Sequence, residues 1–312
     1  MAKNNSTVLF LICIHIVLFV SCSHQPPSKL DAVAGLYSKS IVIPNITYLI
    51  IDSVHLQLDA YIPAKNLGGD PWVEYSPNRK PVLLYIHGGG WNNLNRSVRN
   101  LNFLPYIDKG WAVVNIDYRL LNQAPFPACI IDCRYALNWI YENAGKYKFD
   151  TTKIVVSGES AGGHLALMTG FLPKNSEMII PEKPFTRTLS VAAIINWFGV
   201  SDIEKLMSYW NSINFTNTLV GDTTKKDMIF KSCSPLTYVN SSTPPVLTIH
   251  GDADNAVPFI HATKLHEVLN TFGVKNSLVV MKGKKHGDFD ENEMSDAFGA
   301  IWKFMNELGI KK

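Results

Sequence analysis

The sequence has little charge imbalance, few cysteines, and neither internal repeats nor low-complexity segments. Its 312 residues include 29 basic and 26 acidic side chains, for a formal net charge of +3. Because no basic stripe with interleaved aromatic residues accompanies this small charge, we expect no nucleic-acid partner. With 46% hydrophobic residues, the composition is that of an ordinary globular protein with one large α/β domain or two small ones. A core of this size needs no disulfide or metal to stabilise it.

The five cysteines indicate neither a disulfide framework nor a metal site. Cys13 and Cys22 belong to the N-terminal leader considered next. The other three, Cys129, Cys133 and Cys233, cannot all pair, and the first two lie four residues apart on a predicted helix. We expect them to be small buried hydrophobic residues. No further histidine or cysteine lies close to them in the sequence, so no metal site is predicted.

The first 21 residues have the composition of a signal peptide. Lys3 supplies a positive charge, and residues 8–20 are apolar apart from His15. A helix made of this apolar stretch spans about 20 Å, less than the ~30 Å hydrocarbon core of a bilayer. We therefore predict a cleaved signal peptide over residues 1–21 rather than a membrane span.

The leader ends in Phe-Val-Ser-Cys at residues 19–22, which resembles the lipobox of bacterial lipoproteins. In such proteins the cysteine, here Cys22, is lipidated and becomes the mature N-terminus, although Phe19 departs from the usual Leu. The alternative is an ordinary secretory signal that leaves a soluble protein. Residues 22–39 are polar and contain proline, as expected of a tether. The protein is therefore predicted to be exported to the periplasm or cell envelope, with a lipid anchor as its only membrane attachment.

The remainder, residues 40–312, alternates short apolar runs with helical patterns. This alternation predicts an α/β fold, in which a mostly parallel sheet is covered by helices on both faces. An interval over residues 202–236 interrupts the alternation and is predicted to be a small cap insertion. The predicted strands are residues 48–61 (two strands with a turn near Ser53), 81–86, 112–116, 154–157, 191–195, 246–249 and 278–281, and the predicted helices include 129–143, 163–168, 260–269 and 297–308.

Residues 158–162 read Gly-Glu-Ser-Ala-Gly and fit the pattern G-x-S-x-G. They lie between a predicted strand and a predicted helix, where the pattern forms a nucleophile elbow. Flanking glycines permit the tight turn, and the turn exposes the hydroxyl of Ser160. The context of strand and helix makes this short motif a candidate nucleophile.

A serine nucleophile needs a base within hydrogen-bond reach and a carboxylate that orients the base. In parallel α/β sheets such groups come from loops at the carboxyl ends of strands. His286 follows one predicted strand there, and Asp252 and Asp254 follow another. His164, four residues after Ser160, is expected to be a packing residue instead. The order Ser, Asp, His is that of α/β-hydrolases.

A tetrahedral oxyanion also needs preorganised N–H donors. His-Gly-Gly-Gly-Trp at residues 87–91 follows a predicted strand, and this is the H-G-G-G type of oxyanion loop. The amides of Gly88, Gly89 and Ala161 are the candidate donors. A mechanism of this kind needs no metal or organic cofactor.

Three tryptophans are candidates for the substrate pocket. Trp91 adjoins the glycine loop, Trp197 ends a central predicted strand, and Trp210 lies in the predicted cap. Aromatic rings at such places can stack on a sugar or an aryl acid. Hydrophobic packing is the alternative for each of them.

Taken together, these motifs resemble the esterase/lipase branch of the α/β-hydrolase superfamily over residues 48–308. The recurring segments, in order, are residues 87–91, 117–120 (Asp-Tyr-Arg-Leu), 158–163, 250–258 and 286–287. The H-G-G-G-W loop with a short cap is similar to bacterial carbohydrate-esterase-like proteins, which include acetylxylan and feruloyl esterases, and to kynurenine formamidases. The resemblance implies the α/β-hydrolase fold and acyl transfer to water. It also favours Asp254 over Asp252, because H-G-x-x-D followed by Val-Pro resembles the acid loop of many esterases.

We therefore expect a serine carboxylesterase that hydrolyses small acyl esters through an acyl-enzyme on Ser160. Export suits a polymer-derived substrate, such as acetyl or feruloyl esters of plant polysaccharide. The expected partner is a small-molecule or glycan ester. Two alternatives stay open: an amidase, peptidase or arylformamidase of the same fold, and a non-catalytic binding module on a hydrolase scaffold.

Overall fold

The computed structural model describes residues 40–63, 78–98, 100–173, 176, 178–180, 183–185 and 187–311. The predicted signal peptide, the tether and Cys22 lie outside these residues. Within the described part of the chain, no helix combines the length and the apolar character needed to span a bilayer.

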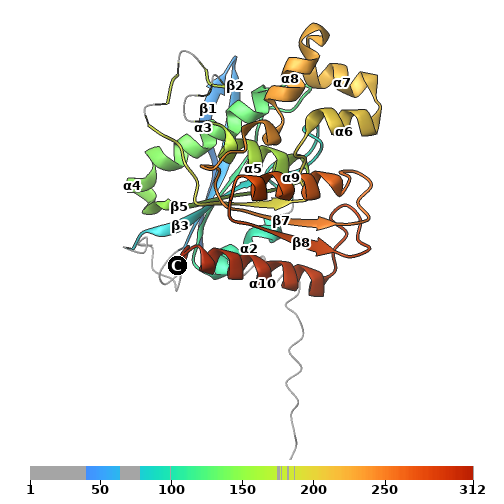
Figure 1. Cartoon of the computed structure of the whole chain (residues 1–312). Helices are drawn as coiled ribbons and strands as arrows, with labels where there is room; N and C mark the ends of the chain where they lie inside the picture. Colours follow the sequence, from blue (N-terminus) through green and yellow to red (C-terminus); the bar gives the residue numbers. More distant parts are fainter. Residues whose placement is uncertain are drawn as a thin grey trace, which may run out of the picture.

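The described residues build an eight-stranded sheet with the order β1-β2-β4-β3-β5-β6-β7-β8. The hairpin β1–β2 forms one edge and pairs antiparallel to β4, whereas the strands from β4 to β8 are parallel. This is the α/β-hydrolase architecture that the motifs implied (Figure 1). The strands are β1 (Ser40–Ile51), β2 (Val54–Pro63), β3 (Lys80–Ile86), β4 (Ala112–Ile116), β5 (Phe149–Glu159), β6 (Ala193–Trp197), β7 (Val246–Gly251) and β8 (Asn276–Met281).

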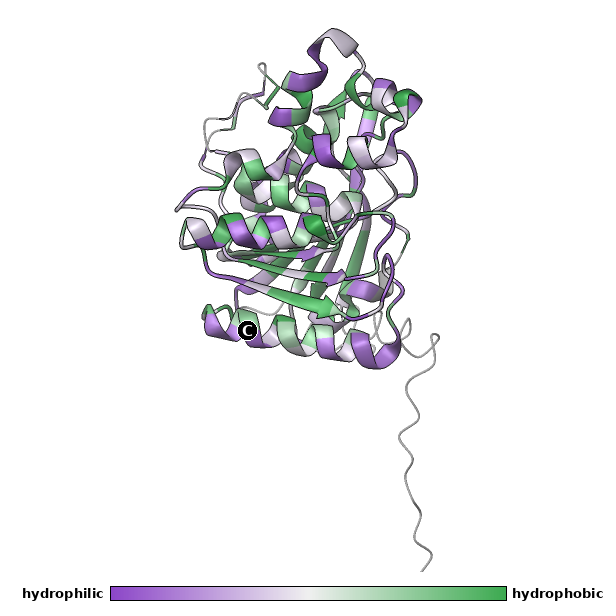
Figure 2. Ribbon diagram, turned by 45° about the vertical axis from the view of Figure 1, so that its right-hand side comes forward, coloured by the Kyte–Doolittle hydropathy of each residue, from purple (hydrophilic) through white to green (hydrophobic). Residues whose placement is uncertain are grey.

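Helices cover both faces of the sheet. Alternate residues of β3 enter two different cores: Leu84 and Ile86 join the larger one, and Leu83 and Tyr85 the other, because successive side chains of a strand point to opposite faces. Figure 1 shows α3, α5 and α9 on one face and α2 and α10 on the other. In Figure 2, α10 alternates green and purple along its length, as an amphipathic helix does. The helices are α2 (Leu104–Asp108), α3 (Ala128–Glu142), α4 (Ala144–Tyr147), α5 (Ala161–Phe171), α9 (Ile260–Thr271) and α10 (Glu291–Glu307).

Between β6 and β7, residues 202–236 hold the helices α6 (Ile203–Trp210), α7 (Ile213–Val220) and α8 (Lys226–Ser232). Their buried residues, among them Leu206 and Leu219, belong to the same hydrophobic core as α5. The insertion therefore packs onto the sheet domain without a separate core. In Figure 1 it lies above α5 and α9, on the side of the sheet that these helices cover.

Several elements differ from their predicted bounds by a few residues, and the two largest differences are at the starts of β1 and α10. The first strand begins at Ser40, whereas the prediction placed its start at Tyr48. The pairing of this strand with β2 contains two register shifts, and these disturb the alternation of apolar and polar residues from which the strand was predicted. The last helix begins at Glu291, six residues before the predicted start. Its N-terminus is a capping box, in which Asp290 accepts from the Glu293 amide at 3.0 Å and Glu293 accepts from the Asp290 amide at 2.9 Å.

Candidate active site

Ser160 occupies a strained turn between β5 and α5. Its backbone angles are φ 53° and ψ −118°, a conformation that non-glycine residues rarely adopt. The neighbouring glycines are required by close backbone approach: a Cβ on Gly158 would overlap the Gly162 carbonyl, and one on Gly162 would overlap that of Ile86. The Ser160 amide donates to the Trp197 carbonyl at 2.9 Å. The fold thus holds the serine hydroxyl above the end of the sheet.

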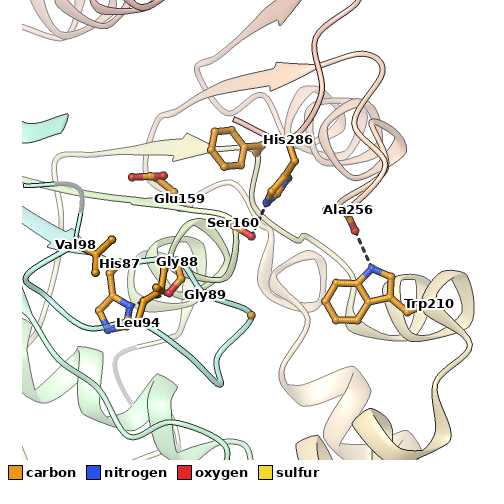
Figure 3. A pocket seen from close by; sticks show the side chains of 12 residues that line it. His87, Gly88, Gly89, Leu94, Val98, Glu159, Ser160, Trp210, Ala256 and His286 are labelled. Carbon is orange, nitrogen blue, oxygen red and sulfur yellow. Dashed lines mark hydrogen bonds between the residues drawn. The ribbon is translucent and has the colours of Figure 1, made fainter. Parts of the chain in front are cut away.

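The structure brings Ser160, His286 and Asp254 into one hydrogen-bonded chain. Figure 3 shows the contact between Ser160 and His286. Ser160 Oγ lies 2.8 Å from His286 Nε2, and His286 Nδ1 lies 2.7 Å from Asp254 Oδ2. The edge of the His286 ring packs against Phe198, with 4.7 Å between ring centroids. Since β5, β7 and β8 are parallel, their carboxyl ends meet at one edge of the sheet, and this edge assembles the three residues from distant positions.

Asp254 is held as a carboxylate. It is 7% exposed, and its Oδ1 accepts from the amides of Ala256 and Val257 at 2.8 and 2.9 Å. Burial acts to raise the pKa of Asp254, but the hydrogen bonds from His250 and His286 outweigh it and hold the pKa well below its ordinary value. The side chain is therefore ionised at neutral pH, as an orienting acid must be.

Asp252, the competing acid, is directed elsewhere. Its Oδ1 accepts from the Gly283 amide at 2.5 Å, so that this exposed side chain joins the loops after β7 and β8. The structure therefore brings Asp254, and not Asp252, to His286.

The glycine loop lies beside the serine. Tyr118, from the Asp-Tyr-Arg-Leu segment, donates to the carbonyls of His87 and Gly88 at 3.0 and 3.2 Å, and its ring stacks on that of His87. In a trans peptide the N–H points opposite to the C=O, so the Gly88 and Gly89 amides point away from Tyr118. A Cβ on Gly88 would lie 2.9 Å from the Glu159 carbonyl oxygen and 3.6 Å from Ser160 Cβ, which explains the need for glycine here. Ala161 is the first residue of α5, where amides lack intrahelical partners.

Arg96 anchors the segment that follows the glycine loop, a role that sequence reasoning missed. Its Nε donates to Asp59 of β2 at 2.9 Å, its backbone amide donates to Asp117 at 2.8 Å, and its guanidinium also binds Asp117 and Asn45. The Arg96 carbonyl accepts from Asn115 at 2.5 Å. Residues 87–98 are thereby attached to the β1–β2 hairpin and to the end of β4.

A cavity of about 340 Å³ opens onto Ser160. Trp210 of α6 forms one wall, where its indole N–H donates to the Ala256 carbonyl at 2.8 Å (Figure 3). The cavity is lined by His87, Gly88, Gly89, Gly90, Leu94, Val98, Glu159, Ser160, Phe198, Trp210, Ala256 and His286.

Trp91 and Trp197 do not line this cavity, contrary to the sequence-based expectation. Trp91 is 1% exposed, and its indole N–H donates to His164 Nδ1 at 3.2 Å. Trp197 packs against Phe298 of α10 on the opposite face of the sheet and lines a separate cavity of about 170 Å³. Both are buried packing residues, so of these three described tryptophans Trp210 alone lines the cavity that contains Ser160.

Glu159 is a cavity residue that sequence reasoning missed. Its carboxylate accepts from Asn102 Nδ2 at 2.6 Å and from the Tyr85 hydroxyl, and its side chain lies between the cavity at Ser160 and the smaller one at Trp197. Its position next to Ser160 in G-x-S-x-G could have suggested that it lies at the site. The direction of its side chain, however, depends on the geometry of the turn, which the sequence does not give.

His164 is a packing residue, as expected. It is fully buried, its Nε2 lies 2.8 Å from the Cys233 carbonyl and its Nδ1 accepts from Trp91. Burial lowers its pKa to about 4. Both ring nitrogens are occupied away from Ser160, so His164 is not placed to act as its base. Cys129, Cys133 and Cys233 are buried thiols, and no group of His, Cys, Asp or Glu among the described residues could hold a metal ion.

Comparison with known protein families assigns this chain to one of them. The sequence profile of the BD-FAE family matches residues 72–269, a range that includes the glycine loop, Ser160 and Asp254. The chain belongs to the BD-FAE family. His286 lies beyond the end of the match, and its place beside Ser160 comes from the fold.

Similar proteins are named as esterases. The chain is 31% identical to esterase LipC of Mycobacterium tuberculosis over 236 residues, which cover 73% of this chain and 58% of that protein. It is 28% identical to esterase LipQ of the same organism, covering 70% and 52%. The chain thus spans about half the length of these relatives. The resemblance to the esterase/lipase branch of α/β-hydrolases is confirmed.

Solved structures cover the chain more completely. A truncated carbohydrate esterase from gut microbiota has a TM-score of 0.70 at 26% identity, covering 86% of this chain and 98% of that one. Butyrate-bound esterase 2 of Thermogutta terrifontis has a TM-score of 0.69 at 25% identity, covering 88% and 95%. These matches support the α/β-hydrolase fold for nearly the whole described domain.

Proposed function

We propose that this protein is a serine carboxylesterase that hydrolyses small acyl esters through an acyl-enzyme on Ser160. The observation that supports it best is the continuous hydrogen-bonded chain from Ser160 Oγ through His286 to Asp254. Membership of a family whose relatives are named esterases supports the same reaction.

In this mechanism the Ser160 oxygen attacks the ester carbonyl while His286 Nε2 takes the hydroxyl proton. The Gly88, Gly89 and Ala161 amides stabilise the oxyanion of the tetrahedral intermediate. His286 then gives its proton to the departing alcohol. Water, activated by the same imidazole, hydrolyses the acyl-enzyme and restores Ser160. Asp254 keeps the proton of neutral His286 on Nδ1 and stabilises the imidazolium.

We propose small acyl groups, acetyl or feruloyl on plant polysaccharide, as the substrate class. The cavity of about 340 Å³ is at the lower end of the range for ligand pockets, roughly 300–1,000 Å³. Trp210 offers an aromatic wall on which a sugar or an aryl ring can stack. A structural neighbour is described as a carbohydrate esterase.

The test compares the wild type with Ser160→Ala on p-nitrophenyl acetate and butyrate. Turnover by the wild type that Ser160→Ala lacks supports the esterase, and equal rates for the two proteins contradict it. A panel of acetylated xylan, methyl ferulate and N-formylkynurenine then separates acetyl, feruloyl and arylformamidase activity. A non-catalytic binding module would turn over none of them.

We further propose export and a lipid anchor on Cys22. Expression of the full chain in a bacterial host with labelled fatty acid tests this directly. Label and membrane association that Cys22→Ser abolishes support the anchor. Secretion of an unlabelled soluble protein supports the ordinary signal peptide instead.

A further inference from the structure

The carboxylate of Asp254 has a second imidazole neighbour besides His286. His250, the penultimate residue of β7, is fully buried. Its Nε2 lies 2.9 Å from the Val257 carbonyl oxygen and 3.3 Å from Asp254 Oδ2. The mechanism described above assigns this buried histidine no part.

The protonation of His250 follows from its partners. A carbonyl oxygen can only accept a hydrogen bond, so Nε2 must carry the proton that faces Val257. The same N–H lies within reach of Asp254 Oδ2, so that the two acceptors share it. His250 Nδ1 has no hydrogen-bond partner among the described residues. A proton on Nδ1 would be buried without an acceptor, so the contacts favour Nε2 as the protonated ring nitrogen.

We propose that His250 is a positioning residue for the orienting acid: its shared Nε2–H fixes the rotation of the Asp254 carboxylate so that Oδ2 faces His286 Nδ1. This inference rests on the proposed esterase function. It assigns a specific task to the first residue of the His-Gly-x-x-Asp segment.

Hydrogen bonds connect Asp254, Val257 and His250 in a closed cycle within the loop that carries Asp254. Val257 donates its amide to Asp254 Oδ1 and accepts His250 Nε2–H on its carbonyl, while His250 returns to Asp254 Oδ2. Two backbone amides therefore fix Oδ1, and two imidazoles share Oδ2. Without His250, only His286 would remain on Oδ2, and the carboxylate could rotate about its Oδ1 contacts.

The electrostatic consequence has a definite sign. A hydrogen bond from His250 withdraws negative charge from Oδ2. Its removal leaves more charge facing His286, which then holds its proton more tightly. The acid limb of the kcat/KM–pH profile should therefore move to higher pH. Other charged or titratable groups near this buried cluster include His261 of α9, which interacts electrostatically with His250 and Asp254, and Asp202 and Lys205 at the start of α6, which act on His261. They are unchanged in the variants below.

The test uses His250→Leu, which removes the donor, and His250→Gln, which retains one. Loss of one hydrogen bond to a charged group should lower kcat/KM about tenfold in His250→Leu and move its acid limb upward by about half a pH unit. His250→Gln should keep the wild-type acid limb. His266→Leu is the matched control, because His266 of α9 is another buried histidine, and its Nδ1 lies 2.7 Å from Asn276 Oδ1 at the start of β8.

A measurement on the wild type keeps the proposal testable even if His250→Leu fails to fold. Nitrogen-15 NMR of the histidine rings at the assay pH should show His250 protonated on Nε2 and not on Nδ1. The Nδ1–H tautomer overturns the proposal, as does a folded His250→Leu with the wild-type acid limb, or His250→Gln shifted as far as His250→Leu. If Ser160→Ala is as active as the wild type, the esterase proposal fails instead, while the tautomer still reports on His250.

Discussion

Replacing Asp254 by Asn tests the assignment of the acid most directly. The substitution preserves size and can keep an oxygen acceptor for the Ala256 and Val257 amides, which bind Oδ1 at 2.8 and 2.9 Å. The new NH₂ group then takes the place of Oδ2. There it faces two donors, His286 Nδ1 at 2.7 Å and His250 Nε2 at 3.3 Å.

The donor–donor conflict gives the expected magnitude. To relieve it, His286 must place its proton on Nε2, which removes the acceptor that Ser160 Oγ requires. By analogy with other triads, kcat should fall about 10⁴-fold, equivalent to ~5.4 kcal/mol of transition-state stabilisation. Asp252→Asn is the matched control. It retains an acceptor for the Gly283 amide and should change kcat less than about threefold, as expected for a surface substitution remote from the reacting atoms.

The assay is steady-state hydrolysis of p-nitrophenyl acetate at pH 8, with thermal melting of both variants to show that they fold. A severe loss in Asp254→Asn with a mild one in Asp252→Asn is the expected result. The reverse order, or a loss of less than tenfold in a folded Asp254→Asn, would refute the argument from geometry.

Three further outcomes are expected. Arg96→Met leaves Asp59 and Asp117 without their shared cation. The free energy of unfolding measured in urea should therefore fall by about 2–4 kcal/mol, and kcat should also fall. An unchanged free energy of unfolding would contradict this prediction. Burial lowers the pKa of His164 to about 4, so below about pH 6.5 the unfolded chain binds a proton that the folded chain refuses. Stability should therefore fall from pH 6.5 toward 4, and less steeply in His164→Asn; parallel slopes would count against it. Trp210→Ala should raise KM for aryl esters severalfold, because Trp210 lines the cavity. Trp197→Ala should reduce stability and leave KM unchanged. Equal effects of the two substitutions on KM would contradict the placement of these rings.

The elements around the site could be predicted because local rules governed them. The runs at residues 81–86 and 246–249 are apolar apart from Thr248, and the structure buries these residues almost completely from both faces. The extension of α10 was also readable in principle, since Asp290 and Glu293 have capping-box spacing. The early start of β1 was not, because its bulges disturb the alternation on which a strand prediction depends.

Two of the three tryptophans predicted to line the pocket do not line it, because their side chains point in other directions. Trp197 ends a strand beside the elbow, but the alternation of β6 turns its ring to the face covered by α10. Trp91 follows the glycine loop with a positive φ of 59° and turns inward against His164. The residue type alone could not predict either direction, because an aromatic ring is buried equally well in the core and in the wall of a pocket.

The sequence by itself determined which chemical groups stand at the ends of which strands: a serine in G-x-S-x-G, a histidine after the last strand, two aspartates after the preceding one, and a glycine loop after the third. These are local features, because each depends on a few neighbouring residues. The His-Gly-x-x-Asp pattern favoured Asp254 over Asp252, and the structure brings Asp254 to His286. Only the tertiary structure decided that His250 approaches the same carboxylate and that Trp210 faces the cavity. Such choices depend on how parallel strands bring together segments as far as 126 residues apart. A shift of one residue in β7 would turn His250 to the other face of the sheet.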